Sequence, residues 1–252
     1  MNPRLLTAIV LMLLSQGKLS AVSPLVTDDA DTVKPGKLQL NCDFFVMRTS
    51  STPLYSVSIN PALGLTPHFE LGAIFGYQWR VGSGSTPTTG DADAVTDLTI
   101  APKFRLWEGL NGNLKFSARA DLKLPTASDR HGLGTGNPDV GLVGIATYKF
   151  GKTSFDSNVG YYAIDISRAD LDNDRWFIGE AVRQELNNDW SVLAEAYAVL
   201  PNTRAGGYAT WYFSGGPQWT VRENIVVTAL IGSAAGHKSP DLTGTFEITL
   251  TF

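Results

Sequence analysis

The stretch "LKFSARADLKL", residues 114–124, alternates without a break between apolar or small side chains and polar ones. Successive side chains of an extended strand point to opposite faces, so such a strand presents two chemically different faces. One face carries Leu114, Phe116, Ala118, Ala120, Leu122 and Leu124, and the other carries Lys115, Ser117, Arg119, Asp121 and Lys123. The stretch therefore predicts a β-strand with one apolar face and one charged face.

Similar alternation recurs along the chain and predicts twelve strands of about ten to twelve residues each. It continues to the final residues, "GTFEITLTF" (244–252), where Phe246, Ile248, Leu250 and Phe252 share one face. No stretch between these segments shows a period of 3.6 residues. The predicted strands lie near 37–48, 53–63, 69–81, 95–106, 114–124, 139–150, 153–164, 175–186, 190–200, 208–221, 225–236 and 242–252.

The segment 175–186 fits this pattern less well than the others. Its alternation places Glu180 and Gln184 on the same face as Trp176 and Ile178. The register of this strand therefore stays open at the sequence level.

The length of the strands and the position of the aromatic residues favour a membrane. Strands of soluble sandwiches are mostly five or six residues long, whereas a tilted strand needs about nine to eleven residues to cross a bilayer. Aromatic side chains such as Trp107, Trp176, Trp190 and Trp219 lie near strand ends, as in the aromatic girdles of membrane barrels. Because no strand edge can stay unpaired in lipid, residues 37–252 are predicted to form an all-β, transmembrane, antiparallel up-and-down β-barrel of about twelve strands.

The links between the predicted strands alternate in length, which supports the same architecture. Tight links are "GLTPH" (64–68), "EGLNGN" (108–113), "GK" (151–152), "NND" (187–189) and "REN" (222–224). The other links are mostly longer, except for "RTSST" (48–52). Outer-membrane barrels have short periplasmic turns and longer outer loops. Residues 22–36 are accordingly predicted to be an N-terminal periplasmic segment, and the barrel to begin and end on the periplasmic side.

The N-terminus predicts export. Arg4 precedes the apolar run "LLTAIVLMLL" (5–14), and small residues then lead to a cleavage position after Ala21. Residues 1–21 therefore predict a cleaved secretory signal peptide, and the barrel predicts the bacterial outer membrane as its location. A formal net charge of -4 gives no basic footprint for nucleic acid, and three histidines and one cysteine leave little for a metal site. We expect no cofactor, no metal and no nucleic-acid partner.

Two stretches resemble a known family. "PLVTDDADTVKPGKLQLN" (24–41) contains Thr27-Asp28-Asp29, and "LKLPTASDRHGLGTGNPDVGLVG" (122–144) contains Leu124-Pro125-Thr126 and a Gly-x-Gly-Thr-Gly loop at 132–136, followed by Asp139. These motifs resemble a family of outer-membrane transporters associated with the meta-pathway of phenol degradation. The resemblance implies a barrel that carries small solutes, with aromatic compounds among the candidates. Separately, the terminal aromatic Phe252 resembles the C-terminal signal that the bacterial outer-membrane assembly machinery reads. Ala127-Ser128 departs from the family pattern, where a glycine or an acidic residue is expected after Thr126.

Twelve charged residues are predicted to face the barrel interior. They are Glu70, Arg80, Asp97, Lys103, Arg105, Lys115, Arg119, Asp121, Lys123, Lys149, Glu195 and Glu247. Two interpretations stay open, because twelve strands lie between the eight that side chains fill and the sixteen that leave a channel. The residues either line a pore for small solutes or pair with one another and close the lumen. Basic residues on the third to fifth strands favour anionic or electron-rich solutes.

The loop "TASDRHGLGTGNPD" (126–139) could fold inward and constrict the pore through Asp129, Arg130, His131, Gly132, Gly134 and Gly136. It does not match a phosphate-binding loop, because neither a helix nor a Lys-Ser/Thr pair follows. The alternative is an ordinary surface loop that uses glycine for its turns.

A hydrolase at the barrel rim is a further alternative. Asp129 and His131 could then work with Ser233 or Ser239, but nothing fixes their geometry, and His68 and His237 are read as solvated residues. Cys42 shares a face with Leu38, Leu40 and Phe44 and is read as a buried small hydrophobic residue. The sequence therefore predicts a channel or transporter without catalytic residues, in contact with membrane lipids and a small-molecule solute.

Overall fold

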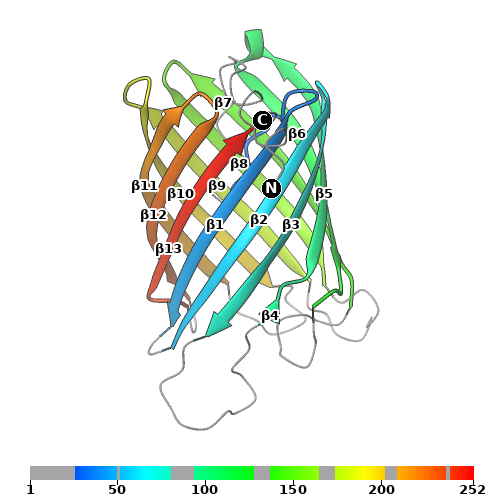
Figure 1. Ribbon diagram of the computed structural model, residues 1–252, viewed down its shortest axis with the longest axis vertical. Helices are drawn as coiled ribbons and strands as arrows, with labels where there is room; N and C mark the ends of the chain where they lie inside the picture. The colour runs from blue at the N-terminus through cyan, green and yellow to red at the C-terminus, as the bar shows by residue number, and fades with distance from the viewer. Residues whose placement is uncertain are drawn as a thin grey trace, which may run out of the picture.

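The computed structural model describes residues 26–49, 52–80, 94–127, 137–164, 174–201, 209–236 and 239–252. They form one antiparallel sheet rolled into a tilted cylinder (Figure 1). The strands are β1 (Leu38–Thr49), β2 (Thr52–Thr66), β3 (Phe69–Arg80), β4 (Ala94–Val95), β5 (Leu98–Gly109), β6 (Leu114–Leu124), β7 (Asp139–Phe150), β8 (Thr153–Ala163), β9 (Arg175–Glu185), β10 (Trp190–Pro201), β11 (Thr210–Arg222), β12 (Ile225–Ala235) and β13 (Leu242–Thr251). Twelve of these strands are long and match the twelve predicted segments within a few residues; β4 is a two-residue strand beside β3.

The cylinder closes because the last strand pairs with the first. Leu40 lies opposite Leu250 in the antiparallel ladder of β1 and β13. The backbone N–H of Phe252 donates to the carbonyl of Leu38 at 2.8 Å, so the pairing continues to the last residue. The sheet leaves no free edge among the long strands, since β2 pairs with both β1 and β3. The predicted closed barrel is confirmed.

Five short turns and the C-terminus lie at one end of the cylinder, which we call the short-turn end (the top in Figure 1). The turn between β5 and β6 contains a single 3-10 turn, Leu110–Gly112, in which Leu110 and Asn111 have φ of 52° and 55°. The turn between β7 and β8 uses Gly151 at φ +60°, a conformation that glycine adopts without steric cost. The predicted tight links therefore all lie on one side.

The outward face of the barrel is apolar over most of its area. Many large apolar side chains on this face are more than a third exposed, including Leu106, Leu142, Phe150 and Ile231 at 62–70%. Aromatic side chains gather near strand ends, as in the stacked pair Trp190–Trp219, with ring centroids 5.6 Å apart. An apolar surface with aromatic side chains at its margins is typical of a barrel that faces lipid. No helix in the described residues is long and apolar enough to cross a membrane.

The structure defines the register of the segment 175–186, which the sequence left open, through its pairing with β8 and β10. Glu180 lies opposite Ser157 of β8 and Ala196 of β10, and all three face outward with Trp176. The Ser157 hydroxyl donates to the Glu180 carboxylate at 2.6 Å. Glu180 is the central residue of the eleven in β9. An ionisable residue is therefore present in the middle of the lipid-facing surface, where it is unfavourable.

We expect Glu180→Leu to stabilise the barrel in lipid vesicles by about 1–2 kcal/mol, because it removes a polar group from the lipid face. The matched variant is Glu195→Leu on the neighbouring strand β10, where Glu195 faces inward and accepts a hydrogen bond from the buried Thr27 N–H at 2.6 Å. That variant should destabilise the barrel by about 1–3 kcal/mol. Urea unfolding followed by tryptophan fluorescence gives both values, and effects of equal sign would contradict this register.

Cys42 was predicted to be a buried residue, and the structure shows otherwise. It lies on the outward face of β1, opposite Ile59 and Ile248, and is only partly buried. An outward position in a barrel faces lipid, so the apolar neighbours of this thiol do not enclose it in a core.

Candidate functional site: an acidic segment inside the barrel

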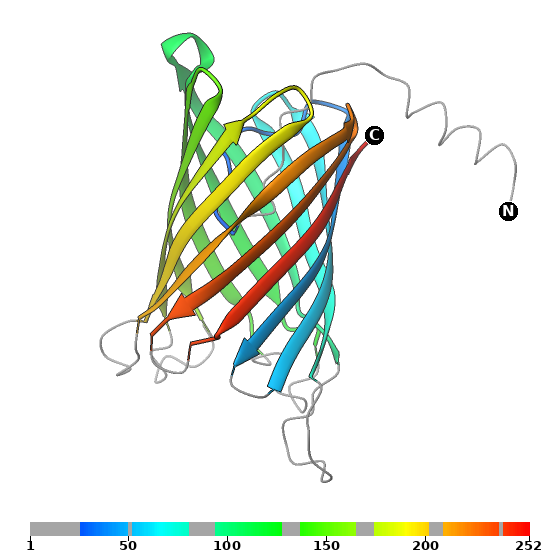
Figure 2. The ribbon, with the colours of Figure 1, turned by 90° about the vertical axis from the view of Figure 1, so that its left-hand side faces the viewer.

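Residues 26–36 enter the barrel at the short-turn end and run along its interior (Figure 2). At the entrance, the Gly36 N–H donates to the Gly64 carbonyl at 2.8 Å. A Cβ on Gly64 would overlap the carbonyl oxygens of Val33 and Lys34, so glycine is required where the segment crosses β2. Residues 27–33 contact side chains of the barrel interior, which differs from the periplasmic location expected for residues 22–36; residues 22–25 lie outside the described residues.

The segment has no secondary structure, so the barrel wall must satisfy its backbone polar groups. Thr27 reaches Glu195, which is the sixth residue of β10, so the segment extends about halfway into the barrel. The Asn158 amide both donates to the Asp28 carbonyl at 2.7 Å and accepts from the Asp28 N–H at 2.9 Å. Further backbone contacts are Val33 N–H to Glu70 at 2.5 Å, Ala30 N–H to Thr147 at 2.8 Å, and the Ser117 hydroxyl to the Ala30 carbonyl at 2.6 Å. Five strands, β3, β6, β7, β8 and β10, thus hold the segment by its backbone.

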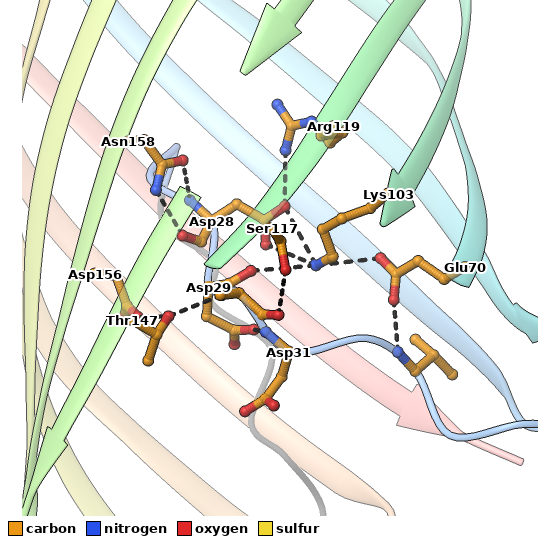
Figure 3. A network of polar contacts seen from close by, with 12 residues as sticks. Asp28, Asp29, Asp31, Glu70, Lys103, Ser117, Arg119, Thr147, Asp156 and Asn158 are labelled. Atoms are coloured by element: carbon orange, nitrogen blue, oxygen red, sulfur yellow. Dashed lines mark hydrogen bonds and ion pairs between the residues drawn. The ribbon is translucent and has the colours of Figure 1, made fainter. Parts of the chain in front are cut away.

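Asp28 lies between two cations of the barrel wall (Figure 3). Its carboxylate is 3.3 Å from Lys103 Nζ and 2.9 Å from Arg119 Nη1. Each cation also has an acidic partner on the wall: Lys103 lies 3.2 Å from Glu70, and Arg119 lies 2.9 Å from Asp121. Burial alone would raise the pKa of Asp28, but the two cations outweigh it and lower this pKa below its usual value.

Asp31 lies closer to the short-turn end and contacts three cations. Its carboxylate pairs with Lys115, lies 3.0 Å from Lys149 Nζ and lies 3.5 Å from Arg105 Nη1. Burial works against the charged form, but the hydrogen bond from Lys115 and the charge of Lys149 lower the pKa of Asp31 to about 2. Asp31 is therefore ionised at neutral pH.

Asp29 differs from its two neighbours because no cation of the described residues bonds to its carboxylate. The backbone N–H of Asp31 donates to it at 2.8 Å, and Lys103 bonds instead to the Asp29 carbonyl at 3.3 Å. Burial, together with the nearby carboxylates of Asp28 and Asp156, raises the pKa of Asp29 to about 7. The segment therefore contains a carboxyl group that titrates near neutral pH.

We expect the segment to be held less tightly as pH rises toward 8. A carboxyl group whose pKa rises from 3.8 to about 7 on docking stabilises the docked state fully below pH 3.8, and this stabilisation is lost as pH rises through about 7. The lowered pKa values of Asp28 and Asp31 have the opposite effect on docking. They stabilise the docked segment at neutral pH, and this stabilisation is lost only as pH falls below about 4. Ionic conductance should thus increase between pH 5 and 8, and Asp29→Asn should flatten this dependence. A slope unchanged by Asp29→Asn would contradict the assignment.

The interior wall opposite these cations is acidic, polar and aromatic. Glu247 of β13 lies opposite Asp43 of β1, and the Thr249 hydroxyl donates to Glu247 at 2.8 Å. Tyr197 and Tyr212 stack with ring centroids 4.6 Å apart. Their rings share the inward face of β10 and β11 with Glu195 and Ser214. The lumen therefore has a cationic side, which the segment covers in part, and a second side with carboxylates and tyrosines.

Most of the residues predicted to line the lumen are brought together by the fold. The segment is contacted by five predicted cations and two predicted acids: Lys103, Arg105, Lys115, Arg119, Lys149, Glu70 and Glu195. Asp121 pairs with Arg119, and Glu247 lies on the opposite wall. Asp97 lies before β5 and not within a strand; it pairs with Lys123 at 3.4 Å, and Lys123 also pairs with Asp139.

Several predicted site residues lie outside the described part of the chain. The side chain of Arg80 belongs to this group, as do the loop residues Asp129, Arg130, His131, Gly132, Gly134 and Gly136, and His237. His68 lies in the turn between β2 and β3, and its carbonyl accepts from the Arg105 N–H at 2.8 Å. The Ser239 hydroxyl donates to the Gly236 carbonyl at 3.1 Å.

The acidic segment is the part of the site that sequence reasoning missed. Asp28, Asp29 and Asp31 were expected outside the barrel, yet they contact five cations of the wall directly or through the backbone. Two signals were present in the sequence: the run of carboxylates in "TDDAD" (27–31) and the excess of basic residues on the neighbouring predicted strands. Charge pairing between them would have placed the segment inside.

Comparisons with known proteins agree with the fold. A model of the family described as "Putative MetA-pathway of phenol degradation" matches residues 23–252. No curated protein matches the sequence significantly.

Among solved structures, an outer membrane channel from Pseudomonas putida F1 is similar, with a TM-score of 0.69 at 16% identity, over 89% of this chain and 98% of that one. The KdgM porin has a TM-score of 0.58 at 7% identity, over 85% and 99% of the two chains. The NanC porin has a TM-score of 0.55 at 9% identity, over 85% and 98%. At these identities the likeness concerns the fold.

Proposed function

Because this chain belongs to the family described as "Putative MetA-pathway of phenol degradation", we propose that it is an outer-membrane channel for small solutes. The observation that carries the proposal is the contrast between the two faces of the closed sheet. The outward face is apolar, whereas the inward face carries charged residues on neighbouring strands. Charged residues inside a membrane barrel mark the path of a polar solute or ion.

The segment 26–36 narrows this path and regulates it. Its carboxylates cancel part of the positive charge of the wall, and its backbone occupies space that solvent or solute would otherwise fill. The segment is joined covalently to the wall only where it continues into β1, and it has no secondary structure that must unfold before it moves. A solute therefore passes when the segment shifts or when the space beside it is wide enough.

Aromatic compounds are a fitting class of solute for the second side of the lumen. Phe177 and Tyr197 have ring centroids 5.8 Å apart, and Tyr197 stacks on Tyr212, so aromatic faces border the interior. Such faces favour stacking with a planar ring. Cations on the opposite wall then favour an aromatic solute that carries negative charge.

Export and assembly complete the proposal. Residues 1–21 direct the chain across the inner membrane and are removed, and the barrel resides in the outer membrane. Phe252, which is paired with β1 through its backbone, is the residue that the assembly machinery recognises. The short-turn end then faces the periplasm, so the segment enters the barrel from that side. The chain performs no chemical step.

Planar-bilayer recording tests the function with a matched pair of variants. The folded protein should give an ionic current. Glu70→Gln removes a negative charge beside Lys103 in the interior and should lower the permeability of cations relative to anions, whereas Glu180→Gln makes the same chemical change on the outward face and should leave selectivity unchanged. A second candidate, a closed barrel without transport, is favoured by the buried ion pairs of the segment. It predicts silence in the same recording.

A further inference from the structure

The three cations around Asp31 form a cluster that carries more positive charge than its partners neutralise. Arg105, Lys115 and Lys149 come from three neighbouring strands, β5, β6 and β7, close to the short-turn end. All three point at one carboxylate. The single further acid paired with them in the described residues is Glu108, 3.3 Å from Arg105 and 40% exposed.

The neighbouring cationic pair gives a contrast within the same wall. Lys103 and Arg119 each have an acidic partner on the barrel, Glu70 and Asp121, so this pair stays balanced when Asp28 leaves. The Asp31 cluster would instead hold three positive charges against Glu108 alone, a surplus of two. Asp156 adds attraction for Lys149 at longer range, but it accepts a hydrogen bond from Thr147 at 2.6 Å.

The hydrogen-bonding capacity of the cluster is also incomplete. The buried Nε–H of Arg105 has no acceptor among the described residues. A guanidinium binds an oxyanion best through two parallel N–H groups, whereas Asp31 contacts Arg105 at a single 3.5 Å distance. The site therefore has an unused donor, Arg105 Nε–H, as well as unused charge, and both features match an anion with more oxygens and more charge than one carboxylate.

From this arrangement we infer that Arg105, Lys115 and Lys149 form a binding site for small dianions, in which Asp31 is a built-in competitor. The inference rests on the proposed function, because it names the class of solute that the channel recognises. A dianion matches the surplus of two charges and can use the Nε–H of Arg105. Asp31 and the dianion bind the same donors, so a bound dianion releases Asp31 and loosens the segment between Asp28 and Val33.

Binding to the folded full-length barrel in detergent tests the inference by calorimetry, with sulfate, phthalate and benzoate as probes. Sulfate and phthalate are dianions, and benzoate is phthalate without its second carboxylate. We expect both dianions to bind more tightly than benzoate. Asp31→Asn, which weakens the competitor but keeps its shape, should tighten dianion binding roughly tenfold. Lys115→Gln and Lys149→Gln should weaken it by a similar factor, while Lys152→Gln in the adjacent exposed turn should not change it.

The outcomes separate this inference from the channel function. Binding is measured without a membrane, so a silent bilayer recording with intact dianion binding would refute the channel and leave the site standing. Equal affinities for phthalate and benzoate, or no gain in Asp31→Asn, would overturn the dianion site while the channel could still conduct. Folding of each variant is checked by its heat-dependent shift in gel mobility. If Asp31→Asn fails that check, the three lysine variants decide, and equal binding by all three refutes the site.

Discussion

Deletion of residues 27–33 is expected to raise the single-channel conductance several-fold and to shift selectivity toward anions. The deleted residues make the hydrogen bonds from Thr27 to Glu195, from Asp28 to Asn158 and from Ala30 to Thr147, and the ion pairs with the cations of β5–β7. Their loss widens the interior and leaves the cations of the Asp31 cluster without their main counter-ion. In a pore, charges on the wall set ion selectivity, so the exposed cations should favour anions.

A second variant separates the volume of the segment from its charge. The triple substitution of Asp28, Asp29 and Asp31 by Asn keeps the length of the chain and removes three carboxyl groups. It should shift selectivity toward anions almost as far as the deletion does, with a smaller gain in conductance. If the deletion leaves both conductance and selectivity at the wild-type values, the segment does not lie in the conduction path.

Lys103→Met is expected to have the largest effect on stability, a loss of about 3–5 kcal/mol, because it breaks a buried ion cluster by removing one partner. Lys103 is 5% exposed and bonds three groups at once. These are the carboxylates of Asp28 and Glu70, at 3.3 Å and 3.2 Å, and the Asp29 carbonyl at 3.3 Å. Without the ammonium group, two carboxylates of the interior face one another without their shared cation.

The control for this prediction is a rescue. Combining Lys103→Met with Glu70→Gln and Asp28→Asn removes the unpaired charges, and most of the lost stability should return. Lys152→Met, at an exposed turn lysine, should change stability by less than about 0.5 kcal/mol. Urea unfolding in lipid vesicles provides the comparison. A Lys103→Met variant as stable as the wild type would show that the cluster contributes little.

The barrel could be predicted from the sequence because its signal is local. Residues two apart decide which face a side chain occupies, so Leu114 through Leu124 specify a strand without reference to the rest of the chain. The closing pair of β1 and β13 follows from the requirement that a sheet in lipid has no edge. Even Glu180, which made one register uncertain, lies on the face that alternation indicated.

The position of the acidic segment could not be predicted in the same way. Residues 26–36 have no periodicity, and their partners are far away in the sequence: 168 residues separate Thr27 from Glu195, and 74 separate Asp29 from Lys103. Secondary-structure patterns carry no information about such contacts. The balance of charges does carry such information. The cations predicted to face the lumen exceed what a low-dielectric barrel interior tolerates without nearby counter-ions.

A disulfide that fixes the segment to the wall tests most directly whether residues 26–33 lie in the conduction path and control it. A Cβ added at Gly179 of β9 would lie 2.5 Å from Thr27 Oγ1, so cysteines at positions 27 and 179, in a Cys42→Ser background, place their side chains close enough to be tested for cross-linking. We predict that the oxidised protein forms the disulfide and conducts poorly, and that a reducing agent added to the same bilayer raises the current. A protein that forms no disulfide, or whose current is the same before and after reduction, would contradict the regulated lumen described above.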